Sequence, residues 1–278
     1  MQEENIRKAV RDGYAQIAKS AGSSCCGPSN KSCCGGASAT DDTSKNIGYS
    51  AEELASIPKG ADLGLGCGNP LAHASLKKGE VVLDLGSGGG IDCFLAANSV
   101  GPTGKVIGVD MTPEMIDKAR ENARKGAFKN VEFRLGEIEN LPVADNSVDI
   151  IISNCVVNLS PDKDRVFAEA FRVLKPGGRL MVSDLVLLKE LPDFIKNSVR
   201  AYVGCLSGAL MKDSYLNAIR KSGLDDVRIL EETVFPVDYM LNDVSAFSLL
   251  KESGKTIEEL SKEISDIIAS VKIYATKR

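Results

Sequence analysis

Hydrophobic positions in the middle of the chain follow two alternating patterns. Short apolar runs bounded by glycine and polar residues are separated by segments in which apolar residues recur at helical spacing. The runs predict strands, and the segments between them predict helices. The predicted strands are 81–86, 105–110, 131–137, 148–154 and 179–185, and the predicted helices are 91–100, 112–127 and 162–174. Strands that alternate with helices favour an α/β fold, with helices on both faces of a parallel sheet.

The last part of the chain shows a different order of elements. Helices are predicted near 193–203 and 212–222, and a strand is predicted at 226–233. The amphipathic segment 256–270 predicts a long helix, and the run 271–277 predicts a final strand. The last two strands can form an antiparallel edge on the parallel sheet. We therefore predict a doubly wound, mostly parallel, seven-stranded sheet with a C-terminal α+β extension.

The N-terminal part joins an amphipathic helix to a segment with little to bury. The helix is predicted over residues 1–20, and its apolar face consists of Ile6, Val10, Tyr14 and Ile17. Residues 21–46 are almost all small or polar, a composition that predicts a flexible segment. We call this segment the Cys-rich arm, because its distinctive content is the two pairs Cys25-Cys26 and Cys33-Cys34. A short helix is predicted after Ser50, where Glu53 completes a capping box.

Composition and charge exclude several classes of function. The chain has 34 basic and 38 acidic residues, so it lacks the basic excess of proteins that bind nucleic acids or anionic membranes. It contains no apolar run near the ~20 residues that span a bilayer. The first residues show no apolar signal-peptide core, and we expect a cytoplasmic protein.

The eight cysteines are the unusual feature of the composition. In a cytosolic chain of this length they indicate metal binding or redox chemistry rather than a disulfide framework. His73 is the single histidine, which excludes Ser-His-Asp catalysis and multi-histidine metal sites. We expect His73 itself to be a surface or packing residue. Four of the cysteines lie in the Cys-rich arm, and the others are Cys67, Cys93, Cys155 and Cys205.

A glycine-rich loop follows the first predicted strand and opens a helix. It reads Asp-Leu-Gly-Ser-Gly-Gly-Gly over residues 84–90, and Asp110 ends the next strand. Glycines allow a close approach of the backbone to a ligand. Asp110 stands 20 residues after Gly90, and an acid at the end of the second strand can bind both ribose hydroxyls. The order differs from the G-x-G-x-x-G of dinucleotide sites. Asp84 suits a ligand that carries an ammonium group and would repel a phosphate.

This pattern resembles the class I S-adenosylmethionine-dependent methyltransferases, over about residues 80–185. Further points of resemblance are Gly-Val-Asp-Met at 108–111, Gly-Glu-Ile-Glu-Asn-Leu-Pro at 136–142 and Leu-Lys-Pro-Gly-Gly at 174–178. The resemblance implies a Rossmann-like core that binds S-adenosylmethionine. It implies that Asp110 holds the ribose, that Met111 packs on the adenine, that Glu137 and the Ile138 backbone read its edge, and that Asn154 lies near the methionine. The implied cofactor-binding residues are Asp84, Gly86, Gly88, Gly90, Asp110, Met111, Glu137, Ile138 and Asn154.

With that core, the chain divides into three predicted parts. Residues 1–48 hold the first helix and the Cys-rich arm, and residues 49–190 form the S-adenosylmethionine-binding core. Residues 191–278 form an acceptor-site or lid region with the closing strands. Cys67 lies in the segment before the first predicted strand, Cys155 follows the fourth strand where doubly wound sheets place ligands, and Cys205 lies in the C-terminal part. Three thiols from distant segments suit a thiophilic ion if they converge.

The wider set of motifs resembles the arsenite methyltransferases. The motifs are the Cys–Cys arm, Leu-Gly-Leu-Gly-Cys-Gly-Asn-Pro at 63–70, Ser-Asn-Cys-Val-Val-Asn-Leu at 153–159 and Gly-Cys at 204–205. The resemblance implies that Cys67, Cys155 and Cys205 bind trivalent arsenic as thiolates. It also implies that an N-terminal cysteine supplies electrons, and the pair nearer the core, Cys33-Cys34, is the better candidate. Because adjacent cysteines seldom bond to each other, we expect a disulfide from Cys33 or Cys34 to Cys67. Thioredoxin or a small thiol would then reset the enzyme.

Two other interpretations use the same core. The shared motifs also occur in methyltransferases of small organic acceptors such as quinones or sterols, which do not need three thiols. A non-catalytic, metalloid-binding thiol protein is the other alternative, and the intact glycine loop and acid argue against it. Cys93, on the helix after that loop, is expected to have a packing role.

Overall fold

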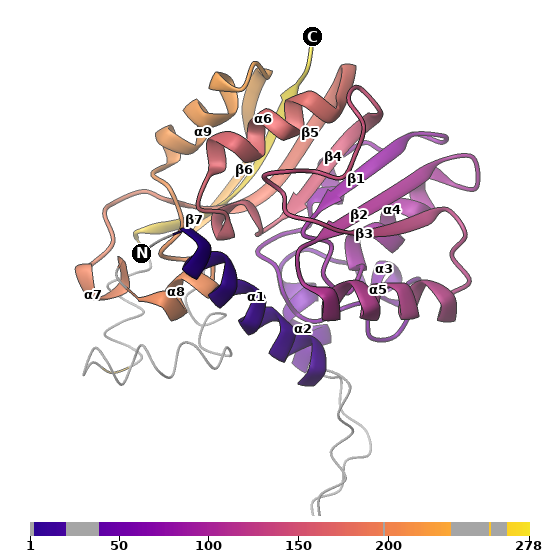
Figure 1. Cartoon of the computed structure of the whole chain (residues 1–278), viewed down its shortest axis with the longest axis horizontal. Helices are drawn as coiled ribbons and strands as arrows, with labels where there is room; N and C mark the ends of the chain where they lie inside the picture. The colour runs from indigo at the N-terminus through magenta and orange to yellow at the C-terminus, as the bar shows by residue number, and fades with distance from the viewer. Residues whose placement is uncertain (1–2, 21–38, 197, 235–255, 257–265) are drawn as a thin grey trace, which may run out of the picture.

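The computed structural model describes residues 3–20, 39–196, 198–234, 256 and 266–278, and these form an α/β structure built on one seven-stranded sheet (Figure 1). The strand order is β3-β2-β1-β4-β5-β7-β6. The strands are β1 (Val81–Leu85), β2 (Lys105–Asp110), β3 (Val131–Leu135), β4 (Val148–Asn154), β5 (Leu174–Leu187), β6 (Asp225–Val234) and β7 (Ile268–Thr276). The predicted class I methyltransferase fold is confirmed.

Helices connect and flank these strands. The α-helices are α1 (Glu3–Ser20), α2 (Ala39–Asn46), α3 (Ala51–Ala55), α4 (Ile91–Val100), α5 (Pro113–Lys125), α6 (Lys163–Val173), α7 (Asp193–Lys196), α8 (Val199–Val203) and α9 (Lys212–Lys221). Two short 3-10 helices, η1 (Pro70–His73) and η2 (Val157–Leu159), follow the loops that carry Cys67 and Cys155. The predicted capping box at Ser50 and Glu53 is present at the start of α3.

The pairing of the strands fixes where a ligand can bind. Strands β1 to β5 are parallel to one another, and β7 is antiparallel to both β5 and β6. The order reverses between β1 and β4, and open α/β sheets place ligands at the carboxyl ends of the strands at such a point. The antiparallel pair predicted at the end of the chain is therefore present, with β6 at the edge.

Two hydrophobic layers hold the helices on the sheet. Successive residues of β1 point to opposite faces, as the strand period requires. Leu83 packs with α6 and α9 in one core, and Val82 packs with α4 and α5 in the other. Both layers are close-packed around fully buried large residues such as Phe94 and Phe167. The carboxyl ends of the strands are thereby held rigidly.

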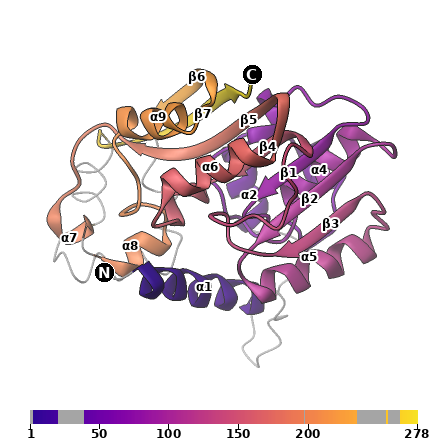
Figure 2. The same ribbon diagram turned by 45° about the horizontal axis from the view of Figure 1, so that its top comes forward.

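A third, smaller cluster lies beyond those strand ends. Val10 of α1, Cys67, Cys205 and Leu185 belong to it. Figure 2 shows α1 running across this end of the molecule, from α8 toward α5. The packing of α1 on α8 is tight, because a Cβ at Gly13 would lie 2.9 Å from the Val203 side chain. The apolar face predicted for the first helix therefore packs on the protein.

Some predicted boundaries were wrong. Residues 39–46 were assigned to the flexible Cys-rich arm but form α2, where buried Ser44 donates a hydrogen bond to Asp62 over 2.8 Å. That tertiary contact is invisible to local composition. The helix predicted at 256–270 cannot extend to its last residues, because β7 begins at Ile268. The single helix predicted near 193–203 comprises two short helices, α7 and α8, and the strand predicted at 179–185 extends over Leu174–Leu187 as β5.

Candidate functional site: a cofactor-type cleft beside a thiol cluster

A cleft lies at the carboxyl ends of β1, β2 and β4, where the strand order reverses. It encloses about 970 Å³ of space, part of which is open to solvent. The glycine loop forms one wall, and residues of α1 form another. The predicted residues that line the cleft come from these three strand ends and, for Ile138, from the loop after β3; they are Asp84, Gly86, Gly88, Asp110, Met111, Ile138, Asn154 and Cys155. Gly90 and Glu137 are not among the residues that line it.

The glycine loop is shaped by backbone conformations that favour glycine. Gly86, Gly88 and Gly90 have φ of 70°, 50° and 98°. A Cβ at Gly86 would lie 2.3 Å from the Val156 side chain, whereas one at Gly88 would meet nothing within 4 Å. Asp110 supports this loop, because one carboxylate oxygen accepts from the Gly88 N–H over 2.9 Å and the other accepts from Thr112 over 2.8 Å. Gly88 therefore presents open backbone to the cleft.

Two carboxyl groups lie deep in the cleft, and no basic side chain among the described residues pairs with either of them. Asp84 and Asp92 are both 3 % exposed. Burial raises the pKa of Asp84 well above its ordinary value, and the charge of Asp92 raises it further. Burial also raises the pKa of Asp92, to about 6. A positively charged ligand group in the cleft would relieve this cost, so the pair suits an ammonium or sulfonium group.

Asn154 connects the cleft to the loop that carries Cys67. Its Oδ1 accepts from the Cys67 N–H over 3.2 Å, and its Nδ2 donates to the Gly68 carbonyl over 2.7 Å. The same Nδ2 also donates to the Tyr49 hydroxyl over 2.9 Å and to Asp92 over 3.3 Å. Tyr49 in turn donates to Asp92 over 2.7 Å. One amide therefore joins a buried acid of the cleft to the Cys67 backbone.

The other end of the cleft carries acidic and basic side chains. Glu139 lines the cleft and accepts from Ser160 over 2.7 Å and from Arg7 of α1 over 3.4 Å. The side chain of Glu137 is 43 % exposed and lies 3.8 Å from Arg7. Met111 and Ile138 supply apolar surface to the wall. The adenine-reading role expected for Glu137 stays a prediction.

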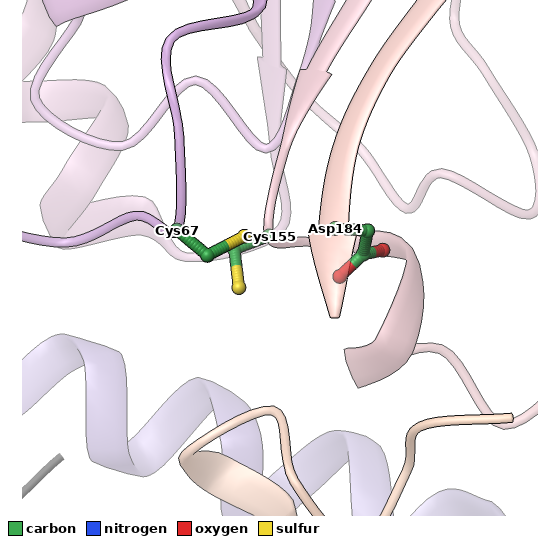
Figure 3. A group of neighbouring side chains, drawn as sticks. All are labelled: Cys67, Cys155 and Asp184. Atoms are coloured by element: carbon green, nitrogen blue, oxygen red, sulfur yellow. The ribbon is translucent and has the colours of Figure 1, made fainter. Parts of the chain in front are cut away.

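The three cysteines singled out in the sequence converge beside the cleft. Sγ of Cys67, Sγ of Cys155 and a carboxylate oxygen of Asp184 all lie within 4.8 Å of one another (Figure 3). The thiol of Cys205 donates to the Cys155 carbonyl over 2.9 Å. All three are free thiols, and Cys155 alone of the three also lines the cleft. Cys155 is therefore the point at which the cleft and the thiol cluster meet.

The backbone around two of these thiols is strained. Cys155 and Cys205 have φ of 56° and 63°, in the left-handed region that non-glycine residues seldom occupy. Such conformations cost of order 1–3 kcal/mol each and cluster at functional sites. Here they turn two side chains toward a shared space at the end of β4.

The thiols are held in their neutral form. Burial raises the pKa of Cys67. The contact with Cys155 and burial raise the pKa of Cys205. At Cys155 the hydrogen bond with Cys205 lowers the pKa, but the Cys67 thiol and burial outweigh it, and the result lies well above the ordinary value. Neutral thiols are suited to ligands that bring their own hydroxide groups, because each thiol proton can then leave as water.

Asp184, at the carboxyl end of β5, was missed by the sequence analysis. It is fully buried, and its carboxylate accepts from Leu185 N over 2.9 Å, Asn158 Nδ2 over 2.8 Å and the Tyr215 hydroxyl over 3.0 Å. Burial raises its pKa to about 6. Asp184 is the one acidic residue in the fifth predicted strand, and this position could have identified it as a candidate site residue from the sequence.

The N-terminal helix was also missed as a part of the site. Arg7, Val10 and Tyr14 of α1 line the cleft. The Tyr14 hydroxyl lies 3.9 Å from Sγ of Cys205, and burial raises the pKa of Tyr14, as do the neighbouring thiols. The sequence predicted the apolar face of this helix but not the cleft and thiol cluster on which that face packs. The remaining sequence-predicted thiols, Cys33 and Cys34, lie outside the described residues.

Cys93 and His73 lie outside the cleft and the thiol cluster. Cys93 is fully buried in the layer under α4, and its thiol donates to Asp84 over 3.2 Å. Its packing role is consistent with the prediction. His73 lies at the surface, with Nε2 3.1 Å from Glu231. Within the described residues, every helix is too short or too polar to cross a lipid bilayer.

The residues of the cleft fit the cofactor that the motifs imply. S-adenosylmethionine has a cationic methionine end, a ribose and an apolar adenine. The buried, uncompensated acids Asp84 and Asp92 suit the first, Asp110 beside open Gly88 backbone suits the second, and Met111 and Ile138 suit the third.

Comparison with known proteins gives the same result. The methyltransferase domain family model matches residues 76–223. The crystal structure of an arsenic (III) S-adenosylmethionine methyltransferase from Chlamydomonas reinhardtii superposes with a TM-score of 0.61 at 31 % identity, covering 85 % of this chain and 73 % of that one. An arsenite methyltransferase of Halobacterium salinarum is 52 % identical over 85 % of this chain, and one of Homo sapiens is 39 % identical over 56 %.

The chain spans 62 % of the length of the Halobacterium relative and 44 % of the human one. The matched part contains the glycine loop, Asp110, Asn154 and Cys155 in the arrangement described above. The chain belongs to the arsenite methyltransferase family of S-adenosylmethionine-dependent methyltransferases.

Proposed function

We propose that this protein methylates trivalent inorganic arsenic, bound to thiols, with S-adenosylmethionine as the methyl donor. The observation that carries the proposal is the position of Cys155, which lines the cofactor-type cleft and also lies in the cluster with Cys67 and Cys205. A methyl donor in the cleft and an acceptor on the thiols would then be neighbours. The Halobacterium and human relatives, both named arsenite methyltransferase, support the same substrate.

Residues at the strand ends would hold the donor. Asp110 and the Gly86–Gly88 backbone would bind the ribose side, and Asp84 and Asp92 would face the cationic methionine end. Asn154 would fix the distance between that end and the Cys67 loop. S-adenosylmethionine supplies an electrophilic methyl group on a sulfonium sulfur. Alignment of two reactants in one cleft can be worth about 7–11 kcal/mol of the barrier.

The thiols would hold the acceptor. Arsenite carries three hydroxyl groups, and three thiols replace them with release of three waters and no net change in protons. The raised pKa values of Cys67, Cys155 and Cys205 do not oppose this exchange, because each proton leaves with a hydroxide. Arsenic keeps a lone pair and can act as the nucleophile. No general base is required, which agrees with the absence of a histidine from the cleft lining.

A redox step would follow each transfer. Formation of the As–C bond raises arsenic formally from the trivalent to the pentavalent state, and two electrons return it. A pair of thiols supplies those electrons when it closes to a disulfide. We assign this role to Cys33 or Cys34 of the Cys-rich arm together with Cys67. Thioredoxin or a small cytoplasmic thiol would then reduce the disulfide.

An organic acceptor is the alternative with an observation behind it. A demethylmenaquinone methyltransferase of Lactococcus lactis is 34 % identical over 55 % of this chain and 63 % of its own length. This similarity fits an organic acceptor, but a carbon or oxygen acceptor does not require three converging thiols. The thiol cluster therefore favours the metalloid.

The deciding experiment incubates the full chain with arsenite, S-adenosylmethionine and a thiol reductant, with arsenic species separated and identified by mass. We expect mono- or dimethylated arsenic together with S-adenosylhomocysteine. A demethylmenaquinone analogue run in parallel covers the alternative acceptor. Methylation of that compound, with arsenite unchanged, would reverse the assignment.

A further inference from the structure

The Asp184 carboxylate lies beside the thiol cluster, and the proposed function gives it no part in holding either reactant. Asp184 is on β5, and one of its carboxylate oxygens is within 4.8 Å of the sulfurs of Cys67 and Cys155 (Figure 3). It is fully buried, and its three hydrogen bonds come from the backbone of Leu185, the amide of Asn158 and the hydroxyl of Tyr215. A charged side chain is rarely buried to this extent without a directly paired cation.

We propose that Asp184 is a fixed negative charge that stabilises the positive charge developing on arsenic during methyl transfer. This inference rests on the proposed function. It assigns to Asp184 an electrostatic role exerted across the ligand sulfurs, and no direct bond to arsenic. Preorganised charges aimed at the place where charge develops are a major source of rate enhancement in enzymes.

The balance of charge in the transfer step identifies where that stabilisation is needed. The arsenic lone pair forms the As–C bond, while the bond between carbon and the sulfonium sulfur breaks and leaves its electron pair on sulfur. One unit of positive charge therefore moves from that sulfur to arsenic. Arsenic held by three thiolates is neutral before the step and cationic after it. A carboxylate beside two of the ligand sulfurs favours the second state over the first.

Hydrogen bonds and a nearby cation oppose the effect of burial on Asp184 and hold its carboxylate in place. Lys163 of α6 is nearly buried, and its ammonium group donates to the carbonyls of Ser160, over 2.9 Å, and Asn158, over 3.4 Å. Its charge acts on Asp184 and also on Cys205. Lys163 pairs with no carboxylate in the part of the chain that the structure describes, so its charge stabilises the anion from a distance without neutralising it by contact.

The substitution Asp184→Asn removes the charge with little change in shape. The amide oxygen can still accept from Leu185 and Asn158, and the amide nitrogen can donate to Tyr215, whose hydroxyl can reverse its role. Tyr215→Phe is the matched control, since it removes one hydrogen bond and keeps the charge. Single-turnover methyl transfer in mildly alkaline buffer should slow by at least about tenfold in Asp184→Asn. In Tyr215→Phe it should remain within about threefold of the wild-type rate.

A binding measurement separates the charge from a structural role. Arsenite forms a neutral complex with three thiols, whereas Cd²⁺ bound by the same three thiols releases three protons and leaves a net negative charge. The charge of Asp184 opposes the ionisation of these thiols. Asp184→Asn should therefore tighten Cd²⁺ binding at constant pH, followed by thiolate absorption in the ultraviolet, by about tenfold or more. Arsenite affinity should be almost unchanged, and the melting temperature should not fall.

Three outcomes would overturn the inference. They are a wild-type transfer rate in Asp184→Asn, a parallel loss of arsenite and Cd²⁺ affinity, and an equal slowing in Tyr215→Phe. Failure of the proposed function is distinct, because the wild-type protein itself would then form no methylated arsenic. The Cd²⁺ comparison would still measure the charge at the thiol cluster in that case.

Discussion

The cofactor-facing half of the cleft comes from one short stretch of chain, whereas the thiol-bearing half is assembled from distant segments. Asp84, the glycine loop, Asp92 and Asp110 lie within 27 consecutive residues, at the ends of two adjacent parallel strands. Cys67, Cys155 and Cys205 are separated by 88 and 50 residues and come from three loops. The first half is fixed by the sheet, and the second depends on how loops and helices pack over its end.

The two halves also differ in the kind of energy that opposes their formation. In the cofactor-facing half the unfavourable contribution is electrostatic, since the two buried acids Asp84 and Asp92 pair with no cation in the described part of the chain. In the thiol-bearing half the unfavourable term is conformational, because Cys155 and Cys205 occupy the left-handed region. Sites that hold such strain require surrounding structure to impose it. Here α1, α8 and the Cys67 loop pack together in the third hydrophobic cluster.

The largest predicted effect tests whether the thiol-bearing half is an acceptor site at all. Cys155→Ser and Cys205→Ser should each abolish arsenite methylation, because two thiols cannot complete a three-sulfur site. Serine is nearly isosteric with cysteine, so the fold and S-adenosylmethionine binding should persist. Turnover measured by mass, together with arsenic X-ray absorption, checks this through a change from three sulfur neighbours to two.

Cys93→Ser is the matched control for these variants. Cys93 is also a buried free thiol, but it lies in the layer under α4 and donates to Asp84. A serine hydroxyl can keep that hydrogen bond, so this variant should remain active. A fully active Cys155→Ser enzyme would exclude the metalloid site and favour an organic acceptor.

The second effect tests the cofactor-facing half. Asp110→Ala removes the proposed hydrogen bonds to the ribose and also the contacts with the N–H groups of Gly88 and Thr112. Hydrogen bonds to a charged group contribute about 1.5–3 kcal/mol each, so S-adenosylmethionine affinity should fall at least about tenfold. Calorimetric titration measures this, with arsenite affinity as the internal reference. Asp117→Ala, at an exposed position on α5, should bind normally.

The same contrast explains what could be predicted from the sequence. The strands, the glycine loop and Asp110 carry local signals, because period, glycine and strand-end position are read from neighbouring residues. The convergence of Cys67, Cys155 and Cys205 was predicted from strand-end position and family resemblance. Their spacing itself contains no metal motif.

Other parts of the site had no local signal. Tyr14 lines the cleft only because α1 packs across α8 and α5, and Asp92 matters only because Tyr49 and Asn154 reach it. The fold of residues 39–46 depends on the contact between Ser44 and Asp62. Each of these features is a tertiary contact between segments far apart in the chain, which local patterns do not encode.

The third predicted effect tests whether ligand binding in one half of the cleft changes the affinity of the other half. Because Asn154 bonds both Asp92 and the backbone of the Cys67 loop, occupancy of one half should order the other. Arsenite should therefore tighten S-adenosylmethionine binding by about fivefold or more, and S-adenosylmethionine should tighten arsenite binding by the same factor. Asn154→Ala should reduce that factor toward one, whereas Asn140→Ala, at an exposed position, should preserve it. Titrations with and without the second ligand measure the factor, and an unchanged coupling in Asn154→Ala would remove Asn154 as the link.

The smallest effect concerns the electrostatic cost of the cofactor-facing half. Burial raises the pKa of Asp92 to about 6, so the folded, cofactor-free protein holds this proton more tightly than the unfolded chain does. Its ionisation destabilises the fold fully above about pH 6, and this cost disappears as the pH falls toward the ordinary value. A cationic ligand favours the ionised form, so S-adenosylmethionine affinity should rise with pH up to about 6 and then level off. Asp84 should show the same pH dependence, because its pKa is also raised.

Asp92→Asn should accordingly flatten the pH profile of binding, weaken binding at neutral pH and raise the melting temperature of the cofactor-free protein by a few degrees. Thermal unfolding and titrations across this pH range test the prediction, and a lower melting temperature for Asp92→Asn at neutral pH would show that the hydrogen bond from Tyr49 outweighs the cost of the buried charge.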